Sequence, residues 1–484
     1  MPKFSIKTKI SHMQEKVIKE RPLLAYLISD QPVNDYLNSA LQWSLQEDKF
    51  PYAELLRKHI GLDIQRLYGN YFAKIANLQL KEGWAVETGA HLHVPRKYDK
   101  VGVTQGQQIN AAYFQGQVFW AYANHNLGRK LSISLSTGKV PLDNINSGAY
   151  LDLPALKAPV TLASKKKHPD SPQTMIPATG KEELLRKIEQ IEMLKRQRLL
   201  PQNQYEFAML VLNNFLKIQS SFSDQVATTH SLLMDKILPI KQITLDSEKI
   251  GIEFIANVLK DKNSLTHKIF ADSYLREKFI NSFVGILKGW PIGANPFFSI
   301  LQKDEGFRLV NYHGSLDPLV LAKGLKEKKI FPSVIMKFFV MMVEAGISPN
   351  GAWTQAVYCT QTKERAATFL RDIGFNERAE AVELIPTHIA AVSACFGIHE
   401  SNEKYELIDS ISAMLDPIKY DLRNKLDISC RQALLLATPF LYEYLVRQPA
   451  PVSYAELKDE LSFAIFNDNV EAPQLPFSYN VSYT

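Results

Sequence analysis

Apolar residues recur at helical spacing through roughly the first eighty residues of the chain. Leu37, Leu41 and Leu45 are spaced four apart, as on one face of a helix. A second series of leucine, isoleucine and tyrosine residues follows between residues 55 and 71. Few glycines or prolines interrupt these series. The pattern therefore predicts that residues 3–80 are largely helical.

The pattern changes after residue 83 to short segments rich in glycine, threonine and valine. Residues 84–95, 117–124 and 130–142 each end in turn-forming residues and are typical of strands and loops in a small sheet. In the third segment, leucine or isoleucine alternates strictly with serine from Leu131 to Ser136. This period of two predicts a strand with one buried face.

A helical hairpin is expected at residues 179–239. Before it, residues 165–180 are basic and contain three prolines, which is typical of an exposed linker. An apolar stripe then marks the first helix: Leu184, Ile188, Ile191 and Leu194. The second helix is predicted to run from 205 to 238. Such a hairpin serves as a bundle arm, a spacer between domains or a contact in a homo-oligomer.

Helices and short strands alternate from residue 240 onward. Asp317 and Pro318 are well suited to begin a helix, as N-cap and first helical residue. Residues 334–345 are apolar nearly all round, which predicts a buried central helix. We expect amphipathic helices at 362–373 and 405–415. The aromatic, proline-containing segment after residue 447 is predicted to be an extended tail.

These patterns indicate an α/β or α+β protein. It would have a mixed small sheet in its N-terminal part, a helical hairpin and a larger helix-rich C-terminal domain. The expected domains are 1–178, 179–239 and 240–484, the last including the tail.

Composition narrows the class of protein. The chain has 484 residues, of which 46% are hydrophobic, and its net charge of +6 is spread along the whole sequence. A nucleic-acid track would cluster its cations on one face, so nucleic acid is not an expected partner. The longest apolar run, 334–343, is too short to span a membrane and is interrupted by Lys337. Three cysteines and a basic N-terminus without an apolar signal segment favour the cytoplasm.

The first candidate site lies in residues 87–96. In a strand, Glu87, His91 and His93 would share one face, where they suit metal binding or a catalytic or substrate-binding role. His125 is expected near the end of a neighbouring strand and would join them. Surface or packing roles for these histidines are the alternative.

The second candidate is a set of three turn-forming stretches at 104–108, 126–129 and 136–139. Backbone N–H groups in such turns, with Arg129 or Lys139 nearby, can hold a phosphate or a carboxylate. None of the stretches matches the phosphate-binding loop or the dinucleotide fingerprint. Tight turns between strands are the alternative reading.

The third and strongest candidate is at residues 306–317. His313 is placed as a general base, with Asp317 to orient it, although Asp317 also suits a purely structural N-cap. Ser315 is a hydrogen-bond donor or nucleophile. Arg308 and Arg96 are expected to hold an anionic group.

A recognition wall is expected just downstream. Asn350 lies in a predicted turn, and Trp353 and Gln355 would share one face of an extended segment. Stacking on the indole together with amide hydrogen bonds suits a planar or sugar-like ligand. A core tryptophan is the alternative.

The function expected from these residues is an enzyme that acts on a small polar metabolite carrying a carboxylate or phosphate. An acyl- or amide-type transferase or ligase ranks first, since no nicotinamide or flavin fingerprint is present; the sequence identifies no cofactor. The pocket is expected between the N-terminal sheet and residues 306–358. The alternatives are a non-catalytic interaction protein, such as an effector or assembly factor with an exposed apolar stripe on its hairpin, and a metal-dependent hydrolase using His91 and His93.

Overall fold

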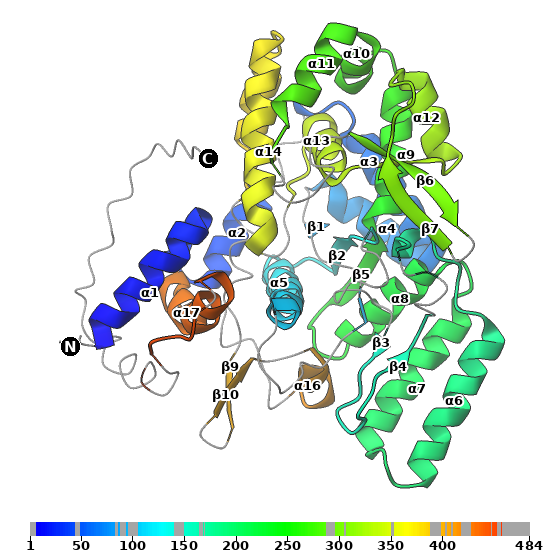
Figure 1. Ribbon diagram of the computed structural model, residues 1–484, viewed down its shortest axis with the longest axis vertical. Coiled ribbons are helices and arrows are strands. Elements are labelled where there is room, and N and C mark those ends of the chain that lie inside the picture. The colour runs from blue at the N-terminus through cyan, green and yellow to red at the C-terminus, as the bar shows by residue number, and fades with distance from the viewer. Residues whose placement is uncertain are drawn as a thin grey trace.

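The computed structural model describes most of the chain as helices packed around small sheets (Figure 1). The described residues are 6–43, 49–82, 86–87, 93–94, 105–139, 150–163, 168, 170–286, 296–303, 306–349, 353–387, 398–401, 404–407, 410–417, 427–446, 448–452 and 456. The predicted α/β class, with small sheets and a helix-rich C-terminal part, is confirmed.

The N-terminal region is helical as predicted. Its elements are α1 (Ile6–Glu20), the 3-10 helix η1 (Pro22–Leu27), α2 (Val33–Trp43), α3 (Ala53–Tyr68) and α4 (Asn70–Lys81). Leu56, Ile60 and Ile64 of α3 are fully buried, which is the face that their spacing predicts.

A three-stranded parallel sheet follows, in the order β1 (Val86–Glu87), β2 (Leu131–Ser136) and β5 (Lys241–Asp246). Two very short antiparallel strands, β3 (Tyr150–Leu151) and β4 (Val160–Thr161), lie apart from it. The predicted strand at 117–124 is wrong, because this segment belongs to the helix α5 (Gln105–Asn126). Its residues 118–121 are all buried, and a short apolar segment fits a buried helix as well as a strand.

The hairpin region contains three helices rather than two. They are α6 (Lys181–Arg196), α7 (Gln202–Lys217) and α8 (Phe222–Met234). The predicted single helix 205–238 is wrong because Ser221 caps α8, accepting a hydrogen bond from the Asp224 N–H at 3.2 Å. The predicted exposed linker is also wrong within residues 170–180: these include the 3-10 helix η3 (Gln173–Met175), beside which Ser171 and Ile176 are buried.

The C-terminal half forms a second, antiparallel sheet of order β7-β6-β8 with helices around it (Figure 1). Its elements are α9 (Ser247–Lys260), α10 (Leu265–Ala271), α11 (Ser273–Ser282), β6 (Phe297–Lys303), β7 (Gly306–Asn311), α12 (Pro318–Lys326), β8 (Ile330–Pro332), α13 (Val334–Ala345), α14 (Trp353–Asp372) and α15 (Asn376–Glu383). Helix α13 is buried along almost its whole length, as its composition predicts.

The last described elements are β9 (Ile398–Ser401), β10 (Lys404–Leu407), α16 (Ser410–Leu415) and α17 (Cys430–Val446). The predicted helix 405–415 is therefore wrong in its first part, where β10 pairs with β9. Helix α17 lies beside α1, which brings the two ends of the described chain together (Figure 1). The predicted extended tail falls mostly outside the described residues.

Two hydrophobic cores support this arrangement, and each draws on distant parts of the sequence. One combines α1, α2 and α5 with α6–α8 and α17. The other combines α3 and α4 with one face of the parallel sheet and with α9–α15. The three predicted domains stay a prediction about which segments fold independently. None of the described helices has the length and apolarity needed to cross a bilayer.

Candidate functional site

Both faces of the parallel sheet are buried, although the alternation of β2 predicts one buried face. The apolar side chains of β2 and β5 face the second core. The opposite face pairs Ser132 with Gln242, Ser134 with Thr244 and Ser136 with Asp246, and each of these six side chains is at most 1% exposed. Burying polar groups costs free energy unless they find partners. A polar face inside the fold therefore marks this sheet as unusual.

Helices α5 and α8 cover this polar face. Gln117 of α5 donates a hydrogen bond from Nε2 to Ser134 Oγ at 3.3 Å. His230 of α8 lies 3.1 Å from Thr244 Oγ1 through its Nδ1 atom. Burial, and next the charge of nearby His93, lower the pKa of His230 to about 3, so the ring is neutral in the folded protein.

The predicted site residue His93 belongs to this interior. Its ring centroid lies 5.6 Å from that of His230, and its side chain is 1% exposed. His125 is exposed in the last turn of α5, not near the end of a strand as expected. The structure thus brings His93 together with His230, a residue that the sequence pattern does not single out.

The carboxyl ends of β2 and β5 carry a second buried polar cluster. Glu248 and Lys337 form an ion pair with 2.5 Å between Oε1 and Nζ, and both side chains are almost fully buried. Thr137 donates a hydrogen bond to the same Glu248 oxygen at 2.6 Å. Lys337 also donates to Ser247 Oγ at 3.0 Å. This cluster ties the turn after β2 to the start of α9 and to the buried helix α13.

Segment 170–176 closes over these strand ends. A Cβ atom at Gly138 would lie 2.7 Å from both carboxylate oxygens of Asp246 and would also collide with Thr174 Oγ1. Asp246 caps α9 through Oδ1, while its Oδ2 atom is buried without a hydrogen-bond donor of normal geometry among the described residues. Burial raises the pKa of Asp246, an effect that Lys249 opposes.

Lys139 is a partly exposed residue of this region. It follows β2 by three residues and extends to the antiparallel sheet, where Nζ donates to the Pro332 carbonyl at 3.3 Å and lies 4.3 Å from the centre of the Phe298 ring. Burial is the main cause that lowers the pKa of Lys139 to about 7; Lys337 lowers it further and Glu248 opposes both.

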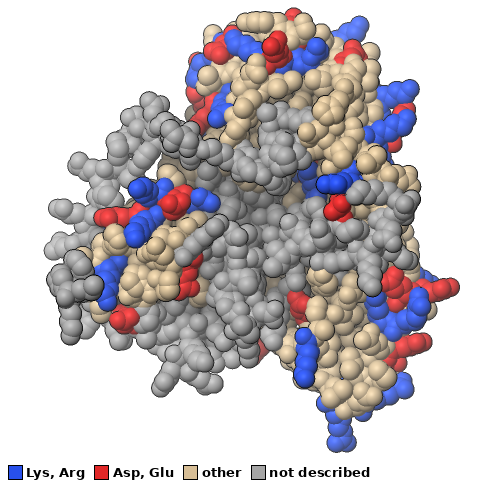
Figure 2. Space-filling model, in the orientation of Figure 1, with Lys and Arg blue, Asp and Glu red and all other residues tan. Residues whose placement is uncertain are grey.

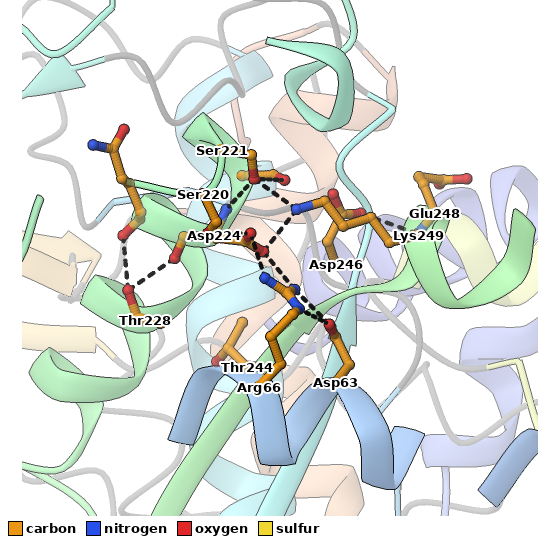
Figure 3. Close-up of polar contacts among 12 residues, drawn as sticks. Asp63, Arg66, Ser220, Ser221, Asp224, Thr228, Thr244, Asp246, Glu248 and Lys249 are labelled. Carbon is orange, nitrogen blue, oxygen red and sulfur yellow. Dashed lines mark hydrogen bonds and ion pairs between the residues drawn. The ribbon is translucent and has the colours of Figure 1, made fainter. Parts of the chain in front are cut away.

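A separate charged network lies beside this cluster, around Asp224 (Figure 3). Arg66 of α3 contacts both Asp224 oxygens, at 2.7 and 3.0 Å, and also pairs with Asp63. Lys249 of α9 donates to Asp224 at 2.7 Å and to Ser221 at 2.6 Å. These bonds hold the pKa of the Asp224 carboxyl well below its usual range despite its burial. The network joins α3, α8 and α9.

The residues predicted at 306–317 lie on the surface. His313 is exposed in the loop after β7. Asp317 caps α12, accepting hydrogen bonds from the N–H groups of Leu319 and Val320 at 2.9 and 3.1 Å, which is its structural alternative. Arg308 of β7 is 56% exposed and lies 3.8 Å from Asp170. Among the contacts of the described residues, none joins His313 to Asp317 or to Arg308.

Some of the remaining predicted site residues fall outside the part of the chain that the structure describes. His91, Arg96 and Asn350 lie outside the described residues. Trp353 and Gln355 begin α14, so the predicted extended segment is wrong at these positions. Residues two apart do not share a face of a helix. The positions of these two side chains lie outside what the structure describes.

Two signals in the sequence point to the cluster that the site predictions missed. Lys139 stands in one of the three turns considered for anion binding. Lys337 interrupts the most apolar run of the chain, where a charge has a large desolvation cost. Glu248 and Thr137 carry no comparable local signal, because their roles depend on strands that are distant in sequence.

Lysine and arginine side chains alternate with aspartate and glutamate over the described parts of the face in Figure 2, without one continuous field of either sign. No group of three or more histidine, cysteine, aspartate or glutamate side chains suited to a metal occurs among the described residues. In comparisons with known proteins, the chain matches no protein-family model and no curated protein.

Proposed function

We propose that the protein is an enzyme that acts on a small polar metabolite carrying a carboxylate or phosphate, bound where the parallel sheet meets the antiparallel sheet. The observation that carries this proposal is the position of Lys139, a partly exposed residue beyond the carboxyl end of a central parallel strand. In open α/β sheets, ligands bind beyond the carboxyl ends of the strands.

The charge of Lys139 supports an anionic ligand. Its ammonium form attracts a carboxylate or phosphate, and a bound anion in turn favours that form. A lysine held beside an acyl or phosphoryl oxygen also stabilises negative charge that develops there during transfer. An acyl- or amide-type transferase or ligase therefore remains the reaction class within this proposal.

The buried cluster supports a preorganised site. Thr137 is held by Glu248, which is held in turn by Lys337, so the turn that carries Lys139 is attached to the rigid helix α13. Catalytic groups are effective when packing and hydrogen bonds behind them restrict their motion.

The interaction-protein alternative stays a prediction. The predicted apolar stripe of α6 faces the interior, since Leu184 and Ile191 are fully buried and Ile188 and Leu194 pack on the same core; Leu185 and Met193 of this helix are exposed. Contact of the hairpin with a second copy stays an expectation without support of its own. A reducing compartment such as the cytoplasm stays part of the proposal, in keeping with the buried free thiols Cys359 and Cys430.

Thermal-shift measurements test the proposed function. Inorganic phosphate and a panel of small carboxylates are titrated against the wild-type protein, Lys139→Met and a matched control, Lys323→Met, which removes a lysine that is 77% exposed on α12. Binding to the native state raises the melting temperature. We expect an anion to stabilise the wild type and the control but not Lys139→Met. Equal stabilisation of all three proteins would place the anion elsewhere.

A further inference from the structure

The surroundings of Lys139 are suited to more than ionic recognition. Its Nζ atom packs 4.3 Å from the centre of the Phe298 ring and 5.9 Å from that of Phe331, and burial disfavours its charged form. The charge of Lys337 also acts on Lys139 and lowers its pKa, while Glu248, the ion-pair partner of Lys337, acts in the opposite sense. Lysines become nucleophilic when an apolar pocket or a neighbouring cation disfavours their charged form.

We propose that Lys139 forms an imine with a carbonyl group of the substrate, which makes the substrate a small oxo acid or a phosphorylated aldehyde or ketone. This inference rests on the proposed function for the anionic group and adds the carbonyl to it. Lys139 follows the carboxyl end of β2 by three residues, at the edge of the sheet where ligands of α/β proteins bind.

The reaction balances without another reagent. The lone pair of the Lys139 nitrogen attacks the carbonyl carbon, a C–N bond forms, and the carbonyl oxygen takes up a proton. The resulting carbinolamine loses one water molecule, whose hydrogens come from the amine, and the imine remains. Hydrolysis by water reverses each step.

The charged groups around Lys139 agree with this role. Burial is the largest cause that lowers its pKa to about 7, Glu248 of α9 acts in the opposite sense, and Lys337 of α13 lowers it again. Nζ contacts the rings of Phe298 on β6 and Phe331 on β8 and donates to the Pro332 carbonyl. A larger fraction of this amine than of an exposed lysine is therefore uncharged at neutral pH. An exposed lysine, with an ordinary pKa of about 10.4, is almost entirely charged there.

Reductive trapping tests the proposal. The full-length protein is incubated at pH 7 with glyoxylate, or with neutral propanal, in the presence of sodium cyanoborohydride, which reduces an imine to a stable secondary amine. Peptide mapping by mass spectrometry then compares the rate of modification at Lys139 with that at exposed Lys323. We expect Lys139 to react at least about tenfold faster, because far more of it is uncharged. In Lys139→Arg, we expect trapping to be lost there and unchanged at Lys323.

The possible outcomes test the imine at Lys139 and the binding of an anionic substrate separately. Trapping at Lys139 no faster than at Lys323 overturns the imine, and stabilisation by phosphate, which has no carbonyl, would then still support the proposed function. Faster trapping by glyoxylate than by propanal, relative to Lys323, supports an oxo acid. Equal enhancement with both aldehydes supports the nucleophile but overturns the anionic substrate.

Discussion

Lys337 and Glu248 form an ion pair inside the protein, with 2.5 Å between Nζ and Oε1. Lys337 belongs to α13, a helix whose other buried residues are almost all apolar, and Gly251 of α9 leaves room for its stem. A buried ion pair is often no more stable than apolar residues of similar size, because both charges lose their hydration. This ion pair lies behind the turn of Thr137 and Lys139, and Glu248 holds that turn by accepting a hydrogen bond from Thr137.

The ion pair predicts a non-additive effect on stability. Lys337→Met leaves Glu248 charged and buried without its partner, which should lower the free energy of unfolding by about 3–5 kcal/mol. Adding Glu248→Gln removes the unpaired charge, so the double variant should recover most of the loss. Urea unfolding of the two single variants and the double variant measures this coupling. Additive losses would mean that the two residues act independently.

Anion binding at Lys139 should depend on pH. Because the amine has a pKa of about 7, its ammonium form predominates below pH 7 and declines above it. Phosphate or carboxylate binding should therefore weaken by up to about tenfold per pH unit above pH 7, while imine trapping should accelerate over the same range. Calorimetric titration with a carboxylate between pH 6 and 9 checks the first trend. Affinity independent of pH would exclude Lys139 as the anion contact.

Close packing over the ends of β2 and β5 predicts that a larger residue at Gly138 lowers the stability of the protein. An alanine Cβ there would press against Asp246 and Thr174, so we expect Gly138→Ala to lower the free energy of unfolding by about 1–3 kcal/mol. Gly180→Ala is the matched control, since a Cβ at Gly180 meets no atom within 4 Å. Thermal unfolding of both variants tests this; a similar small change in each would contradict the packing.

The network around Asp224 predicts a large loss of stability in Asp224→Asn. The variant keeps the size of the side chain but leaves Arg66 and Lys249 without their shared carboxylate, and we expect a loss on the order of 3 kcal/mol. The pKa of Asp224 lies below its unfolded value, so this stabilisation is present above about pH 4 and is lost as pH falls through the folded pKa. Urea unfolding at pH 7 measures the loss, and Glu192→Gln on the exposed face of α6 serves as control.

The low pKa of buried His230 predicts that the protein loses stability in acid. Its pKa is about 3 in the folded protein against about 6.5 when unfolded, so its contribution is complete above pH 6.5 and declines as pH falls toward 3. The decline reaches at most about 1.4 kcal/mol per pH unit for this one group. His230→Gln should show a shallower decline between pH 6.5 and 5 than the wild type in urea unfolding. Parallel curves for the two proteins would contradict a buried neutral histidine.

Local patterns predicted the elements that carry strong signals of their own. The N-terminal helices, the strand 131–136, the cap at Asp317 and the buried helix 334–345 all follow from spacing and capping chemistry within a few residues. The segment 117–124 was ambiguous, because a short run of apolar residues suits a strand or a buried helix equally. The expected long helix is interrupted before α8, because the hydroxyl of Ser221 caps the N-terminus of that helix.

Only part of the candidate site could be predicted from local patterns in the sequence. Lys139 stood in a turn suited to anions, and Lys337 was visible as a charge in an apolar run. The residues around His313 were the strongest candidate in the sequence, but Asp317 is used as a helix cap and His313 lies at the surface. A single sequence shows which groups are present and cannot show which of them meet.

The sequence by itself therefore determined the helical character, the class of fold and the separate segments that could carry chemistry, because these depend on neighbours along the chain. Tertiary structure alone decided that the serine face of β2 is buried, that His93 meets His230, and that Thr137, Glu248 and Lys337 form one cluster behind Lys139. These relationships join residues up to two hundred positions apart. Their physical cause is the pairing of β2 with β5 and the packing of α13 against α9, which place distant side chains in one desolvated space.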